Sequence, residues 1–283
     1  MIMANPTIFK FYLTMLESFS EYLSKKYSDS SLENPDRYKS MIIQKIVRMF
    51  HTLEELTTGT QDEASARCVL RGILDSVTAY CFIYQREDKC DMMFRHYLYA
   101  LDGFITYKKV IIDGVMEDGN NKLKFECACN EVIRQIKLKL SSHPYQKLNN
   151  KNVKKIINSA NWKYESLDKP KGLTFNKMYN YIDWDAKLIC YYQGILSQYS
   201  HGLFLSNIIM LDSEHLQKVL FESIPLADRI IQGICRTFPQ KEMLEHFLHS
   251  DSFKTIINSQ GFNQGDLLNF AKAVIKKDKS LYS

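Results

Sequence analysis

The sequence predicts an all-α fold, a multi-helix bundle built around a buried central helix over about residues 184–201. Three observations lead to this fold class. Glycine and proline, which turn-rich sandwiches and barrels need in number, account for only 11 and 6 of the 283 residues. Apolar residues recur at spacings of three and four, the period of an α-helix. Capping residues mark several helix starts.

The predicted helices cover most of the chain. In order, they lie near residues 6–27, 35–57, 61–86, 88–113, 121–141, 151–159, 174–182, 184–201, 213–237, 240–249 and 264–277. Asn5-Pro6 and Asn34-Pro35 each place a capping residue before a proline at the first helical position. The third helix follows a capping box, in which Thr60 and Glu63 would bond free amides at the helix start.

Two segments interrupt this regular pattern. Pro225 lacks an amide hydrogen and is expected to kink or break the helix over 213–237. Residues 110–115 have strand propensity, but a lone strand is unstable, so the segment is predicted to be helical. Residues 1–283 are predicted to form a single helical domain, with 212–283 as a candidate C-terminal helical subdomain.

The cysteines indicate a reducing compartment. There are seven, an odd number, and no Cys-x-x-Cys pair occurs, so we expect reduced, buried thiols and a cytoplasmic location. Cys127 and Cys129 form a Cys-x-Cys pair that lacks the second half of a zinc site, so no metal is predicted. No cationic segment precedes the first helix, so no signal peptide is expected.

One segment has the length of a membrane span. Residues 188–211 carry no formal charge, and roughly 20 apolar residues are enough to cross a bilayer. The segment nevertheless contains several glutamine, serine, histidine, asparagine and glycine residues. We therefore interpret it as a buried central helix that continues into a loop, and we expect no membrane contact.

Positive charge is concentrated in residues 134–177. This segment holds eleven lysines and arginines but only two acidic residues. A solvated helix face followed by a loop would explain it, and so would a surface that makes weak contact with anions or nucleic acid. No recognisable nucleic-acid-binding motif accompanies the charge, and Trp162 and Tyr164 are the aromatic residues that stand out.

The helix over 61–86 carries charged residues beside its apolar stripe. Arg67, Arg71 and Asp75 follow one another at steps of four residues. Arg71 and Asp75 could form an exposed ion pair, which would contribute only a few tenths of a kcal/mol. Alternatively, the carboxylate could hold an arginine that binds the anionic group of a ligand.

The helix over 184–201 has an apolar face and an opposite face of small or polar residues. Cys190, Gly194, Ser197 and His201 occupy that second face, which carries no lysine or glutamate. We therefore expect both faces to be buried. Buried serine and histidine need hydrogen-bond partners, which Arg71 or Asp75 could supply.

These two helices together predict one polar cluster. Its members are the candidate ligand-binding residues Arg67, Arg71, Asp75, Ser197 and His201. A catalytic Ser–His pair would also need an oxyanion hole, an orienting acid and a nucleophile elbow, and the sequence shows no signature of these. A structural polar network is therefore favoured over catalysis.

Several catalytic and cofactor motifs are absent. No histidine follows an arginine at the spacing of the helical ribonucleases of the higher-eukaryote-and-prokaryote nucleotide-binding class. The acidic and histidine residues between Glu242 and His249 form only one cluster, whereas a di-iron site needs ligands from several helices. Neither a phosphate-binding loop nor a dinucleotide-binding glycine fingerprint occurs, so no cofactor is predicted.

Three short motifs carry a family resemblance. Arg71-x-x-x-Asp75 is followed by Asn161-Trp162 and by a tyrosine-rich helix that ends in Ser197-x-x-x-His201. Over residues 40–210 the chain resembles a family of bacterial helical proteins classified only as a domain of unknown function. That family has Glu at the position of Asp75. The resemblance implies an all-helical fold and a bacterial cytoplasmic setting, but no activity and no catalytic residues.

The absence of strong catalytic motifs favours an intracellular binding or interaction module over an enzyme. The alternative is a hydrolase or nuclease, of stress or phage-defence type, that uses the Arg/Asp/Ser/His cluster with the basic segment as substrate cradle. A third possibility is a small-ligand sensor with a pocket between the two helices. An enzyme needs these residues together in an open cleft, whereas a module can bury them.

Overall fold

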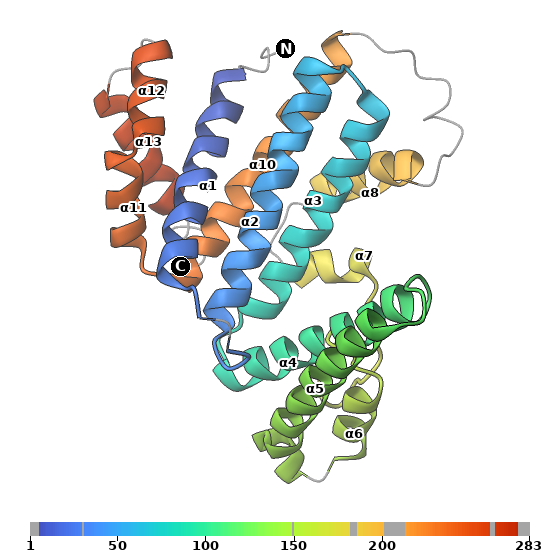
Figure 1. Cartoon of the computed structure of the whole chain (residues 1–283). Helices are drawn as coiled ribbons and strands as arrows, with labels where there is room; N and C mark the ends of the chain where they lie inside the picture. The colour runs from blue at the N-terminus through green and yellow to red at the C-terminus, as the bar shows by residue number, and fades with distance from the viewer. Residues whose placement is uncertain are drawn as a thin grey trace. The chain divides into compact units, whose positions relative to one another are not determined.

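The structure is a computed structural model that describes residues 6–29, 31–148, 150–181, 186–200, 213–260 and 264–276. Every extended regular element in these ranges is helical, so the predicted all-α multi-helix bundle is confirmed (Figure 1). The described residues contain no strand. An isolated bridge pairs Tyr164 with Gly172.

The helix boundaries agree closely with the predicted ones. The α-helices are α1 (Pro6–Lys26), α2 (Pro35–Glu54), α3 (Glu63–Tyr84), α4 (Lys89–Tyr107), α5 (Asn120–Ser142), α6 (Lys151–Asn158), α7 (Phe175–Met178), α8 (Ala186–Ser200), α10 (Ser213–Thr237), α11 (Gln240–His249), α12 (Asp251–Gln260) and α13 (Gln264–Lys276). Single turns of π-helix, η1 (Glu55–Gly59) and η2 (Lys108–Ile112), extend α2 and α4, while 3-10 turns η3 (Pro144–Leu148) and η4 (Tyr179–Tyr181) follow α5 and α7. Helix α12 has no counterpart among the helices predicted from the sequence.

The chain divides into two compact units. The first unit holds residues 1–30, 36–81 and 182–283, and the second holds residues 31–35 and 82–181. Helices α10 to α13 therefore lie in the same unit as α1. The single domain over 1–283 with a subdomain over 212–283 stays a prediction.

Aromatic side chains build much of the first unit's core. Helix α1 packs against α10, α11 and α12, and it lies beside α2 (Figure 1). The ring centroids of Phe11 and Phe247 lie 5.9 Å apart, and those of Phe9 and Phe50 lie 6.3 Å apart. Tyr12 of α1 adds a polar contact by donating to Asp228 of α10 at 3.1 Å. Aromatic burial and edge-on ring contacts stabilise this arrangement.

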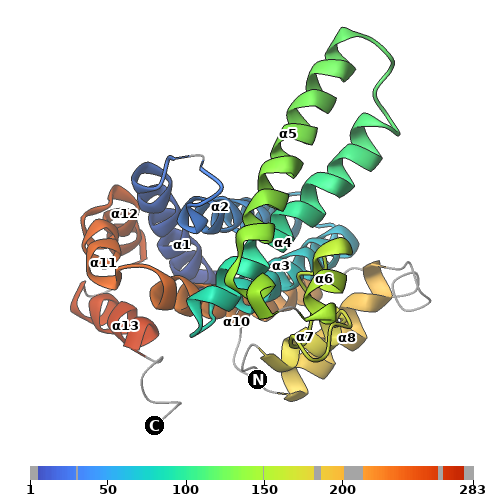
Figure 2. The ribbon, with the colours of Figure 1, turned by 90° about the horizontal axis from the view of Figure 1, so that it is seen from below.

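The second unit is organised around a helical hairpin. Figure 2 shows α4 and α5 running side by side in opposite directions, joined by η2 and the loop over 113–119. The segment over 159–174, which follows α6, packs on α4. Trp162 in this segment is buried and donates from its indole nitrogen to Asp102 of α4 at 3.1 Å.

The predicted capping box before α3 is wrong by two residues. The π-turn η1 continues the chain through Gly59, and Gln61 then adopts a left-handed conformation with φ 55°. Asp62 is therefore the residue that caps α3, since its carboxylate accepts from the amide of Ser65 at 3.1 Å. Residues 108–112 are helical, as expected for that segment. Helix α10 continues through Pro225, so the expected break of the helix at this proline is wrong.

Helix α8 is buried on one face only. Tyr192, Leu196 and Tyr199 are buried, but Cys190 and Gly194 are exposed. The prediction that both faces are buried is therefore wrong. Its premise was that a helix face without charges must be covered, whereas small and uncharged polar residues can also face solvent.

All seven cysteines are free thiols, as expected, but Cys68, Cys127 and Cys190 are exposed, so the expectation of burial is wrong for these three. No helix within the described ranges is long and apolar enough to cross a membrane. The same part of the chain contains no group of three or more acidic, histidine or cysteine side chains placed to hold a metal ion.

The exposure of Gly194 predicts how substitutions at this position change the free energy of unfolding. Apart from the adjoining backbone of α8, no atom of the described residues lies within 4 Å of the place where a β-carbon would stand. Gly194→Ala should therefore raise the free energy of unfolding by about 0.5–1 kcal/mol. Urea denaturation followed by circular dichroism measures this. Gly194→Leu is the sharper variant, because a covering helix would turn it into an overpacked residue with a loss of about 1–3 kcal/mol. We expect no such loss.

Candidate functional site

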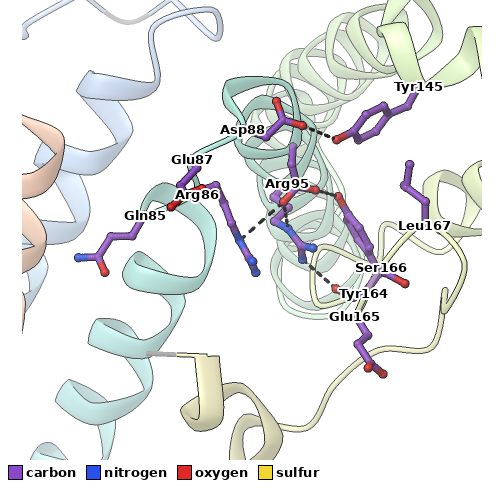
Figure 3. A pocket seen from close by; sticks show the side chains of 11 residues that line it. Gln85, Arg86, Glu87, Asp88, Arg95, Tyr145, Tyr164, Glu165, Ser166 and Leu167 are labelled. Atoms are coloured by element: carbon purple, nitrogen blue, oxygen red, sulfur yellow. Dashed lines mark hydrogen bonds and ion pairs between the residues drawn. The ribbon is translucent and has the colours of Figure 1, made fainter. Parts of the chain in front are cut away.

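A polar pocket of about 500 Å³ lies within the second unit (Figure 3). Its walls come from the segment between α3 and α4, the first turns of α4, η3, and the segment after α6. Three charged side chains, Arg86, Asp91 and Arg95, form its centre, and Tyr145 and Tyr164 flank them. We call this cavity the polar pocket.

Arg95 is the residue that holds the pocket wall together. Its side chain is only 2% exposed, and its Nε donates to Asp91, four residues earlier on α4, at 2.9 Å. Its Nη1 donates to the carbonyl oxygens of Trp162 and Tyr164 at 3.1 and 2.8 Å. Its guanidinium carbon also lies 3.8 Å from the centroid of the Tyr164 ring. One buried guanidinium thus fixes the segment after α6 against α4.

Several hydrogen-bond donors surround the carboxylate of Asp91. Besides Arg95, it accepts a hydrogen bond from the hydroxyl of Tyr164, and its Oδ2 lies 3.6 Å from Nε of Arg86. Burial raises the pKa of Tyr164, and the negative charge of Asp91 adds to the rise while Arg95 opposes it. The Tyr164 hydroxyl therefore remains a donor rather than an acid at neutral pH.

Arg86 differs from Arg95 in being incompletely bonded. Its Nε donates to the carbonyl of Phe82 at 2.8 Å, and both guanidinium carbons lie against the Phe82 ring, at 4.4 Å for Arg86 and 4.6 Å for Arg95. Nη2 of Arg86 is buried and has no hydrogen-bond partner among the described residues. Burial, and after it the charge of Arg95, lowers the pKa of Arg86. The pair therefore holds more positive charge than Asp91 neutralises.

The other acidic residues around the pocket are mostly engaged elsewhere. Asp88 caps α4 by accepting from the amide of Cys90 at 2.7 Å, and it also accepts from the Tyr145 hydroxyl at 3.1 Å. Glu165 pairs with Lys169 at 3.0 Å, and Figure 3 shows it directed away from Arg86 and Arg95. Neither carboxylate serves as the missing partner of Arg86.

His143 supports the pocket from behind Tyr145. Its Nδ1 accepts from the amide of Tyr145 at 3.3 Å, and its Nε2 lies 3.7 Å from the sulfur of Cys90. Its ring packs on Phe94 with centroids 4.8 Å apart. Burial lowers the pKa of His143, and an added proton on Nδ1 would face the amide hydrogen that Nδ1 now accepts.

The residues predicted from sequence lie in the first unit. Arg67 is enclosed by two carboxylates: its Nε donates to Glu63 at 2.6 Å, and its Nη1 donates to Glu222 of α10 at 2.9 Å. The three side chains are between 3% and 6% exposed. Arg67 is thus bound by acidic groups of the protein itself, which leaves it poorly placed to bind a ligand anion.

Tyrosines of α8 complete this buried network. The Tyr199 hydroxyl donates to Glu63 at 3.1 Å, and its ring centroid lies 5.0 Å from the guanidinium carbon of Arg67. Tyr191 donates to the Glu222 carboxylate, and Tyr192 donates to the Glu222 carbonyl. Helices α3 and α8 therefore meet through Tyr199, a residue that was not among the five predicted from the sequence.

The structure describes three of the four remaining predicted residues. Arg71 and Asp75 form a partly exposed ion pair at 3.2 Å, and Ser197 is half-buried. His201 lies outside the described residues. The convergence of all five into a ligand site, with its alternative catalytic role, stays a prediction.

The basic segment over 134–177 is divided among α5, η3, α6, the segment after it, and α7. Several of its cations have acidic partners: Arg134 pairs with Glu131 at 2.7 Å, Lys139 with Glu33, and Lys169 with Glu165. The segment also supplies Tyr145 and Tyr164 to the polar pocket. It also contributes Glu165, Ser166 and Leu167 to the pocket lining, which includes none of the described lysines of the segment.

Sequence reasoning missed Arg86, Asp91 and Arg95. Asp91 and Arg95 stand four residues apart on α4, which is the same spacing that singled out Arg71 and Asp75 on α3. The overlooked signal was the aromatic pair Trp162 and Tyr164. The backbone carbonyls of both accept from Arg95, and the Tyr164 ring lies over its guanidinium.

Comparison with known proteins identified no relative. No family model matches the chain, and no curated protein or solved structure matches it either. Membership of the bacterial helical family stays a prediction.

Two arginines of α3 provide a matched test of the buried network. Arg67→Met should lower the free energy of unfolding by about 3–5 kcal/mol, because it leaves Glu63 and Glu222 buried without their cation. Arg71→Met removes a partly exposed pair and should cost less than about 1 kcal/mol. Denaturant unfolding of both variants measures the difference. Equal losses would contradict the enclosure of Arg67.

His143 should make stability depend on pH. Its folded-state pKa lies below its unfolded value, so the unfolded chain takes up the proton first as the pH falls. Stability is therefore fully present above the unfolded value of about 6.5 and declines as the pH falls below it. In His143→Gln the free energy of unfolding should change less between about pH 7 and 5 than in the wild type. Identical slopes would show that His143 does not contribute.

Proposed function

We propose that this chain is a binding module that takes the anionic group of a small molecule into the polar pocket, with Arg86 as the principal binding group. The observation that carries the proposal is the buried Nη2 of Arg86, which has no partner among the described residues. An unmet buried donor costs about 1–3 kcal/mol, and an anionic oxygen would remove that penalty. Arginine suits carboxylate and phosphate groups in particular.

The local charge supports an anionic ligand over a neutral one. Arg86 and Arg95 share the single carboxylate of Asp91 at the centre of the pocket. An anion beside Arg86 would balance the second guanidinium. Arg95 itself already donates to Asp91 and to two carbonyl oxygens, so it acts as a positioning residue that keeps the pocket wall in place.

The size and the walls of the pocket support a small molecule. A volume of about 500 Å³ falls in the range that holds metabolite-sized ligands. Tyr145 and Tyr164 offer aromatic surface beside the arginines, and their hydroxyls are held by Asp88 and Asp91. Such a site can orient an aromatic or aliphatic body while Arg86 binds its carboxylate or phosphate.

The arrangement favours binding over catalysis. A catalyst needs a nucleophile or a general base free to act on the ligand. Here Asp91 accepts from Tyr164 and Arg95, Asp88 caps α4, and His143 faces Tyr145 and Cys90. The alternative function, a hydrolase or nuclease, rests on the Arg/Asp/Ser/His cluster predicted from the sequence. It has less support because Arg67 of that cluster is already bound by Glu63 and Glu222.

We also propose that the chain belongs to the bacterial helical family and acts in the cytoplasm. The motifs Arg71-x-x-x-Asp75, Asn161-Trp162 and Ser197-x-x-x-His201 support this. Anion contact would then occur at the polar pocket rather than along the whole basic segment, several of whose cations are already paired.

Substitution of Arg86 tests the proposed function. Sodium phosphate and sodium benzoate are titrated into the protein at constant ionic strength, and backbone amide shifts in the NMR spectrum report binding. Arg86→Met should weaken binding by at least about tenfold, because a hydrogen bond to a charged group contributes about 1.5–3 kcal/mol. The two ligands distinguish phosphate from carboxylate recognition.

Arg134→Met is the matched control. Arg134 is an arginine of the same unit that pairs with Glu131 on the surface of α5, so its removal should leave the affinity unchanged within about twofold. Equal binding by wild type and Arg86→Met would refute the proposal. So would equal loss in both variants, since that would indicate general attraction between a cationic surface and anions.

A further inference from the structure

The far end of the α4–α5 hairpin exposes an unusual amount of apolar surface. We call residues 105–126 the hairpin tip. Thirteen large apolar side chains are strongly exposed in the described part of the chain, and seven of them lie in the tip, with exposures between 37% and 70%. The other six are scattered along the chain and need no special explanation. Seven within one short segment concentrate exposed apolar surface at the tip, and such a concentration marks an interaction site.

The tip has almost no core of its own. Between residues 102 and 128 only Ile112 is buried. Tyr107, Ile111 and Val115 follow one another at helical spacing, and the backbone bond from Val115 to Ile111 continues the turn. Amphipathic helices owe most of their stability to packing of the apolar face. The exposed side chains of the tip therefore lack the contacts that normally hold such helices.

The charges of the tip indicate what kind of surface covers it. Residues 105–126 contain four lysines and four acidic residues, so the tip has no net charge. Nucleic acid and anionic lipid surfaces bind segments with excess positive charge, so neither fits. Lys108–Glu126 and Lys122–Asp118 pair within the tip at 3.1 and 2.8 Å.

The remaining charges are self-complementary. Four exposed side chains, two of each sign, take part in no ion pair within the described residues: Lys109, Lys124, Asp113 and Glu117. A two-fold axis presents the same patch on both partners, so the cations of one copy can face the acids of the other. A patch with both signs and no net charge satisfies this requirement, whereas a patch of one sign would repel its copy.

We infer that the hairpin tip is the docking surface for a second copy of this chain. Two tips laid across one another form a four-helix arrangement whose centre is filled by the exposed apolar side chains. Two such patches together bury on the order of 1,000 Å², the lower limit for a specific interface. The inference is independent of the polar pocket, so either one can fail without the other.

Sedimentation velocity on the full chain, over a concentration series, tests the dimer. The wild type should change from monomer to dimer as concentration rises. Phe125→Glu should raise the dimer dissociation constant at least about tenfold, because it places a charge in the apolar patch. Leu138→Glu is the matched control on the same helix, since Leu138 is 49% exposed and Phe125 is 52% exposed. Leu138 lies outside the tip, so the dimer dissociation constant of Leu138→Glu should stay within about twofold of the wild-type value.

Complementary charge variants make the test independent of any single substitution. Lys109→Glu/Lys124→Glu gives an acidic tip, and Asp113→Lys/Glu117→Lys gives a basic tip. Each should be monomeric alone, because like charges face each other, and an equimolar mixture should dimerise. Wild-type protein that remains monomeric up to about 100 µM would overturn the inference, because such weak association is below that of specific interfaces. So would a Phe125→Glu dimer as tight as that of Leu138→Glu, or a mixture that stays monomeric.

Discussion

A buried guanidinium needs a carboxylate partner to neutralise its charge, and this requirement shapes both units of the structure. Arg67 and Arg95 are each paired with a carboxylate four residues earlier on the same helix, Glu63 and Asp91. An unpaired charge at either position would be strongly destabilising. This pairing lies within one helix, but each arginine also binds a second element. Arg67 donates to Glu222 of α10, and Arg95 donates to backbone carbonyls of the segment after α6.

The two arginines use the same arrangement to attach a further element. A tyrosine ring covers the guanidinium, and the hydroxyl of that tyrosine donates to the partner carboxylate. Tyr199 does this for Arg67 and Glu63, and Tyr164 does it for Arg95 and Asp91. Stacking on an aromatic face suits arginine better than lysine, because the guanidinium is planar and weakly hydrated. The position of α8 and that of the segment after α6 both follow from this contact.

What distinguishes the two clusters is the balance of charge. In the first unit, Arg67 has a second carboxylate in Glu222, so the cluster is closed and its acidic charge exceeds its basic charge. In the second unit, Arg86 adds a second guanidinium to the single carboxylate of Asp91 and leaves a buried donor at the pocket. One cluster is therefore suited to holding helices together, and the other to receiving an anion. Along α4 the environment then changes from this enclosed end to the exposed hairpin tip.

The sequence by itself determined the fold class and nearly every helix, because apolar periodicity, caps and scarce glycine and proline act within a few residues of where they occur. Only the tertiary structure decided which of two charged pairs with the same four-residue spacing is buried at a pocket. Asp91–Arg95 and Arg71–Asp75 look alike in the sequence, yet Arg95 is enclosed by Trp162 and Tyr164 from about seventy residues away, while Arg71 remains partly exposed. The same holds for α8, whose charge-free face indicated burial although Gly194 is exposed and no described side chain lies against it. Whether a side chain is enclosed depends on contacts between segments that are distant in the sequence. A local sequence pattern does not specify which distant segment packs against it.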